Sequence, residues 1–86
     1  MSFGSVLRDL RLDRNMTQEE MGFAAEIQRK HVSSLELGLK QPSLSTIFKL
    51  ARALQIRPSQ LIAQVEQVQG DPNIRTASPM RDNAGR

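Results

Sequence analysis

The sequence contains no cysteine, tryptophan or tyrosine, and its only aromatic residues are three phenylalanines. The lack of cysteine excludes disulfides and thiolate metal sites, which is compatible with a reducing cytoplasm. No apolar run approaches the roughly 20 residues that a membrane-spanning helix needs. Residues 1–14 carry charges every few positions and lack the apolar segment of a signal peptide. We therefore expect a soluble cytoplasmic protein with no membrane partner.

Residues that carry catalysis or bind metals are also scarce. His31 is the one histidine, and no second ligand stands near it at metal-site spacing. It is expected to pack or to be solvated beside the recognition surface. As an alternative, a charge gained at lower pH would strengthen its attraction to phosphate. Glu19 and Glu20 are adjacent, and the first turn of a helix explains both, because carboxylates there face the positive end of the helix dipole. The sequence therefore predicts no enzyme activity, no metal site and no cofactor.

The chain has 86 residues, enough for one small domain, and a formal net charge of +3. A mild basic excess is a weak sign of a nucleic-acid partner, because many soluble proteins are as basic. The position of the cations matters more than their sum.

Apolar residues recur at helical spacing along most of the chain, and nothing alternates as a strand does. The pattern predicts an all-α fold, a compact bundle of about five short helices. We expect them over residues 3–14, 17–25, 28–37 and 44–54 and from 58 onward. Residues 70–86 are rich in Gly, Pro, Asn, Asp and Ser, so we expect a folded domain over 1–69 and a disordered tail over 70–86.

Local signals mark the ends of these helices. Thr17 and Glu20 have the spacing of a capping box. Asn15 suits a left-handed helix end, and Gly38 suits the position just past the third helix. The fourth helix is expected to bury a stripe of apolar residues, Leu44, Ile47, Leu50, Ala51 and Leu54. Two phenylalanines outside the expected stripes, Phe23 and Phe48, are each expected to be partly buried by a neighbour or, if exposed, to mark a surface for a partner.

The third helix combines a short buried stripe with a polar, basic outer surface. Val32 and Leu35 are spaced to face inward, which leaves cations and hydroxyls facing outward on Arg29, Lys30, Ser33 and Ser34. A short helix of this kind, following another across a tight turn, is typical of a helix-turn-helix that reads the major groove of DNA.

With the helices placed, the chain resembles the phage repressor/Cro-like family of bacterial regulators, often called the XRE family. Four segments between Phe3 and Ile62 carry the resemblance: LRLDRNMTQEEM, AAEI, HVSSLELG and PSLSTIFKLARAL. The family usually has glycine in the turn where this chain has Glu26, and a Ser or Thr cap where it has Gln28. The resemblance implies a lambda repressor-like DNA-binding domain that regulates transcription.

The resemblance also implies roles for particular residues. Gln18 is expected to contact a phosphate, Arg29 and Lys30 to reach base edges, and Lys40 to contact a phosphate from the loop after the third helix. Arg11 and Glu36 are expected to form a structural ion pair. The full set of candidate DNA-binding residues is Gln18, Gln28, Arg29, Lys30, Ser33, Ser34 and Lys40.

A single short helix reads too few base pairs for a specific site, so we expect a homodimer on a pseudo-palindromic operator of double-stranded DNA. The fifth helix is the candidate interface, with Ile56, Arg57, Ile62, Val65 and Val68. The apolar members could instead complete the monomer core. An alternative function is an antitoxin-like protein whose main role is to dock a protein partner.

Overall fold

The computed structural model describes residues 2–69, in which five helices and no strands are present. The expected tail, 70–86, lies outside the described residues. The helices are α1 (Ser2–Asp13), α2 (Gln18–Ala25), α3 (Arg29–Glu36), α4 (Leu44–Leu54) and α5 (Pro58–Gln69). The all-α prediction is confirmed. None of the described helices is long and apolar enough to cross a membrane.

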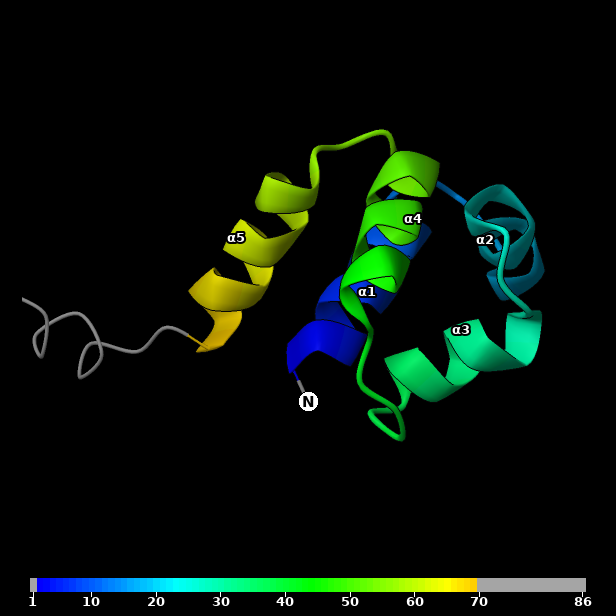
Figure 1. Ribbon diagram of the computed structural model, residues 1–86, viewed down its shortest axis with the longest axis horizontal. Helices are drawn as coiled ribbons and strands as arrows, with labels where there is room; N and C mark the ends of the chain where they lie inside the picture. The colour runs from blue at the N-terminus through cyan, green and yellow to red at the C-terminus, as the bar shows by residue number, and fades with distance from the viewer. Residues whose placement is uncertain (1, 70–86) are drawn as a thin grey trace, which may run out of the picture.

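α1 and α4 form the centre of the bundle, with α5 on one side and α2 and α3 on the other (Figure 1). The core contains residues from all five helices, and several of its side chains are fully enclosed. The largest of these are Leu7, Met21, Leu35, Leu50, Leu54, Leu61 and Val32. Burial of this apolar surface is the main contribution that favours folding of the small domain.

The expected helix caps are present. The Thr17 hydroxyl accepts the backbone N–H of Glu20 at 3.0 Å, and the Glu20 carboxylate accepts the backbone N–H of Thr17 at 2.8 Å. Ser43 caps α4 in the same way by accepting from Thr46 N at 3.1 Å. Gln28 makes no side-chain cap, which agrees with its poor capping ability. The third helix begins one residue later and ends one residue earlier than expected, at Arg29 and Glu36.

Two glycines allow α3 to lie close against its neighbours. A Cβ atom on Gly4 of α1 would lie 2.5 Å from the carbonyl oxygen of Glu36. A Cβ atom on Gly22 of α2 would lie 2.7 Å from the carbonyl oxygen of Ile27. Both oxygens belong to the backbone and cannot move aside without shifting the chain. The lack of a side chain at these two positions therefore sets how closely α3 approaches α1 and α2.

Three burial predictions were wrong. Leu44 is 70% exposed, because it occupies the first position of α4, where no neighbouring element covers it. Phe23 is 88% exposed and Phe48 is 55% exposed. Phe23 lies on the face of α2 opposite the buried Met21 and Ala25, and is left in solvent. The helical spacing indicates which residues share a face, but not how far the neighbouring helices extend over it.

Candidate nucleic-acid interface

α3 presents its polar side outward, as its sequence predicts. Val32 and Leu35 have no exposed surface and fix the helix against the core. Arg29 and Lys30 are exposed at its first turn, and Ser33 and Ser34 are half-buried one turn later. Figure 1 shows α3 crossing one end of the bundle, away from the α4–α5 connection. The exposed Arg29 and Lys30 leave the first turn of α3 accessible to a ligand.

Arg11 and Glu36 meet in an ion pair between α1 and α3. Arg11 Nε donates to Glu36 Oε2 at 2.7 Å, and Arg11 Nη2 donates to Glu36 Oε1 at 3.0 Å. A third donor, Arg11 Nη1, reaches the carbonyl oxygen of Met16 at 2.8 Å. The hydrogen bonds and charge of Glu36 raise the pKa of Arg11 above its ordinary value despite the opposing effect of burial. Arg11 therefore stays charged, and its bidentate geometry fixes α3 relative to α1.

Gln18 connects this ion pair to the outer surface of α3. Its side-chain Nε2 donates to Glu36 Oε1 at 3.1 Å, and its Oε1 accepts from Arg29 Nη1 at 3.3 Å. The two contacts give the Gln18 amide one orientation and hold the Arg29 guanidinium beside the start of α2. Sequence reasoning treated Gln18 and Arg29 as separate DNA contacts and missed this link.

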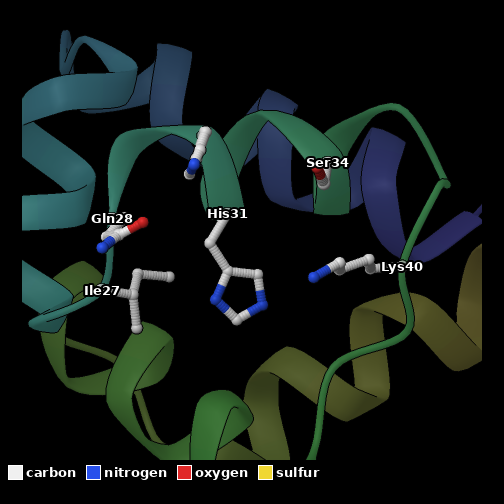
Figure 2. A pocket seen from close by; sticks show the side chains of 6 residues that line it. Ile27, Gln28, His31, Ser34 and Lys40 are labelled. Atoms are coloured by element: carbon white, nitrogen blue, oxygen red, sulfur yellow. The ribbon is translucent and has the colours of Figure 1, made fainter.

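A hollow of about 470 Å³ opens beside α3, between the α2–α3 turn and the loop that follows α3. It is lined by Ile27, Gln28, Lys30, His31, Ser34 and Lys40. In Figure 2 the His31 ring points into the middle of the hollow, and the Lys40 amine is directed toward it. The structure thus brings four of the candidate DNA-binding residues together. It adds Ile27, which the sequence reasoning did not place at the interface, and it directs His31, expected only beside the recognition surface, into the hollow (Figure 2).

The residues expected at a dimer interface run from the α4–α5 connection along α5. Ile62 is 44% exposed and Arg57 is exposed, whereas Ile56 and Val65 are half-buried and pack against the core. The side chain of Val68 lies outside the described residues. A second hollow, of about 500 Å³, adjoins this region and is lined by Phe48, Arg52, Gln55, Ile56, Arg57 and Pro58. It lies at the C-terminal end of α4, far from the polar side of α3.

Within the described residues, no group of three or more His, Cys, Asp or Glu side chains is arranged to hold a metal ion. The charged groups that do gather beside α3 are cations. Arg29 and Lys30 come from the helix itself, and Lys40 comes from the following loop. Guanidinium and ammonium groups on a helix of this size suit phosphate oxygens and the acceptor atoms of base edges.

Comparisons with known proteins agree with this geometry. The HTH_3 helix-turn-helix family matches residues 7–61. Control protein C.BamHI of Bacillus amyloliquefaciens is 36% identical over 61 residues, covering 70% of this chain and 75% of that protein. The cryptic phage CTXphi transcriptional repressor RstR of Vibrio cholerae is 31% identical over 64 residues, covering 74% of this chain and 58% of the repressor.

A solved structure shows the same arrangement of helices. The restriction-modification controller protein C.AhdI from Aeromonas hydrophila superimposes with a TM-score of 0.68 and 40% sequence identity. The superposition covers 70% of this chain and 91% of that protein. The family match contains the whole of α2, the turn and α3, together with Arg11, which pairs with Glu36 of α3. The chain therefore belongs to the HTH_3 helix-turn-helix family, of the XRE or Cro/repressor type, and is a DNA-binding transcriptional regulator.

Proposed function

We propose that the protein reads a pseudo-palindromic operator by placing α3 in the major groove. One observation carries this proposal: Arg29 stands exposed at the first position of α3 while Gln18 holds its guanidinium from α2. A guanidinium in a fixed position can donate two parallel hydrogen bonds to guanine O6 and N7, which is the commonest base-specific contact. A DNA target also implies that the protein works in the cytoplasm.

The other candidate residues divide between bases and phosphates. Lys30 lies beside Arg29 in the first turn of α3, and Ser33 and Ser34 follow one turn later, so we assign these three to base edges. Gln18, at the start of α2, contacts Arg29 and Glu36 of α3, whereas Lys40, in the loop after α3, lines the hollow with Lys30, His31 and Ser34, so the two flank different sides of the helix. Contacts on both flanks suit the two sugar-phosphate backbones that border a groove. We assign Gln28, the residue just before α3, to a phosphate contact as well.

We propose further that the protein binds as a homodimer through the start of α5 and the α4–α5 connection. The exposed Ile62 and Phe48 and the hollow beside Ile56 supply an apolar surface. Arg52 and Arg57 lie at its edge. This surface is at the end of α4 opposite the α3–α4 loop, so two copies can associate there and leave both α3 helices free. Successive major grooves on one face of a duplex are about 34 Å apart, which sets the spacing that the dimer has to match.

Selection of bound sequences from a pool of random duplexes tests the proposal directly. A pseudo-palindrome of two related half-sites, about one helical turn apart, is the expected outcome. Affinity for the recovered duplex should fall steeply as salt rises, because phosphate contacts release counterions. Recovery of no preferred sequence, with weak binding to every duplex, would refute sequence-specific reading. It would favour the alternative in which the domain chiefly docks a protein partner.

A further inference from the structure

We propose that DNA binding is coupled to the uptake of one proton by His31, so that a proton is a second ligand of the same interface. This inference rests on the proposed function, because it assigns a regulatory role to the hollow beside α3. His31 is half-buried and lines that hollow together with Lys30, Ser34 and Lys40. Its ring points into the middle of the hollow (Figure 2).

The charged groups around His31 come from two elements. α3 contributes Lys30, and the α3–α4 loop contributes Lys40. The third wall, the α2–α3 turn, contributes the uncharged Ile27 and Gln28. None of the residues that line the hollow in the described part of the chain carries a carboxylate. A hollow with this lining attracts an anion. When a duplex lies against α3, its phosphodiester groups are the anions nearest to the hollow.

A phosphate in the hollow or at its mouth shifts the equilibrium between the charged and the neutral form of the His31 imidazole. The charged form gains attraction to the phosphate and can donate hydrogen bonds from both ring nitrogens, whereas the neutral form donates from only one. Histidine changes charge in the range between pH 5 and 8. DNA therefore favours the charged form, and by linkage the charged form favours DNA.

The direction of the effect follows from this linkage. Affinity for DNA rises as pH falls through the range in which His31 takes up its proton. It levels off once His31 is charged in both the free and the bound protein. For a single proton, the affinity changes by no more than about tenfold per pH unit. From pH 8 to pH 6 we therefore expect the affinity to rise severalfold, within the limit of about a hundredfold that one proton allows over two pH units.

Because His31 is the one histidine of the chain, its ring gives a single Cε1–H signal in proton NMR. The test follows this signal from pH 5.5 to 8.5 in the free protein and in the presence of a saturating mixed-sequence 30-base-pair duplex. In parallel, fluorescence anisotropy of the labelled duplex measures affinity at pH 6 and pH 8. The same affinity measurements are made with His31→Gln, whose amide is neutral throughout this range.

The expected result is a higher pKa for the signal in the complex than in the free protein, and a pH-dependent affinity that His31→Gln largely abolishes. An unchanged pKa in a complex that anisotropy shows to be fully formed would overturn this inference and leave the proposed function intact. The inference would also fail if His31→Gln kept the full pH dependence. If anisotropy shows no complex at either pH, the proposed function fails and this inference fails with it.

Discussion

The guanidinium of Arg29 donates a hydrogen bond to the side-chain oxygen of Gln18 across 3.3 Å. The residue expected to read a base is thus held by the residue expected to bind a phosphate. Gln18 in turn donates to Glu36 at 3.1 Å, so both are connected to the ion pair between α1 and α3. If the two residues have the proposed roles, base reading and phosphate binding share one set of hydrogen bonds, and a substitution of either residue should alter both.

Arg29→Ala should relax sequence preference, because it removes the side chain that we assign to a guanine. The expected loss is about 1–3 kcal/mol of discrimination at one position of each half-site. Competition between the selected duplex and single-base variants measures it. The control is Lys40→Ala, which should weaken binding to every duplex alike and reduce the salt slope by about one. An unchanged preference in Arg29→Ala would mean that α3 does not read the site through this residue.

Gln18→Ala should both weaken binding and relax sequence preference, because it removes a phosphate contact and frees Arg29. The effects of Gln18→Ala and Arg29→Ala should therefore not add. For residues in one hydrogen-bond network, the coupling is on the order of 0.5–3 kcal/mol. A double-mutant cycle of binding affinities on the selected duplex measures it. Strict additivity would show that the 3.3 Å contact has no role in the complex.

Arg11→Met should destabilise the fold by about 3 kcal/mol or more, because it leaves the Glu36 carboxylate buried without its cation. The side chains of the pair are only 9% and 3% exposed. Urea unfolding measures the loss. The matched control is Arg14→Met, one residue past the end of α1, which removes an exposed residue and its 2.7 Å hydrogen bond to the Leu54 carbonyl. This control should cost about 1 kcal/mol. Equal losses in the two variants would contradict a special role for the ion pair.

Glu26→Gly should stabilise the protein by about 1 kcal/mol. Glu26 has a φ of 61°, in the left-handed region that costs a residue with a Cβ atom about 1–2 kcal/mol. The larger backbone entropy of glycine in the unfolded chain offsets part of the gain. Gln55→Gly is the parallel case, since Gln55 has the same φ of 61° at the end of α4. Thermal melts of both variants test the expectation, and a lower melting temperature in either would count against it.

Ile62→Asp should convert a dimer into a folded monomer and weaken operator binding. Ile62 is 44% exposed, so the monomer does not depend on it as it depends on the fully buried Leu61. Sedimentation measures the mass, and circular dichroism measures the fold. Phe23→Asp is the control, because it places the same charge at an 88% exposed apolar residue on α2. An Ile62→Asp variant that keeps the wild-type mass would place the interface elsewhere or show that the protein is monomeric throughout.

Local chemistry explains which features were predictable from the sequence. The capping box at Thr17 and the left-handed Asn15 depend on residues within one turn, so their spacing alone predicted them. Two other features depend on how separate elements lie in space. They are the contact of Gln18 with Arg29 and the position of Lys40 at the hollow beside α3. No spacing rule contains that information. The exposure of Phe23 was missed for the same reason, because it depends on which face of α2 the other helices leave uncovered.

Glu36 joins three helices, since it belongs to α3 and accepts hydrogen bonds from Arg11 of α1 and Gln18 of α2. Together with the close backbone approaches at Gly4 and Gly22, this junction leaves α3 little freedom to tilt or slide when it meets a duplex. In the proposed dimer, a misfit between the spacing of two α3 helices and the pitch of the double helix must then be taken up by the DNA or by the dimer interface, and not by α3. Affinity should therefore depend on how readily the base pairs between the half-sites bend and twist, including base pairs that no side chain touches.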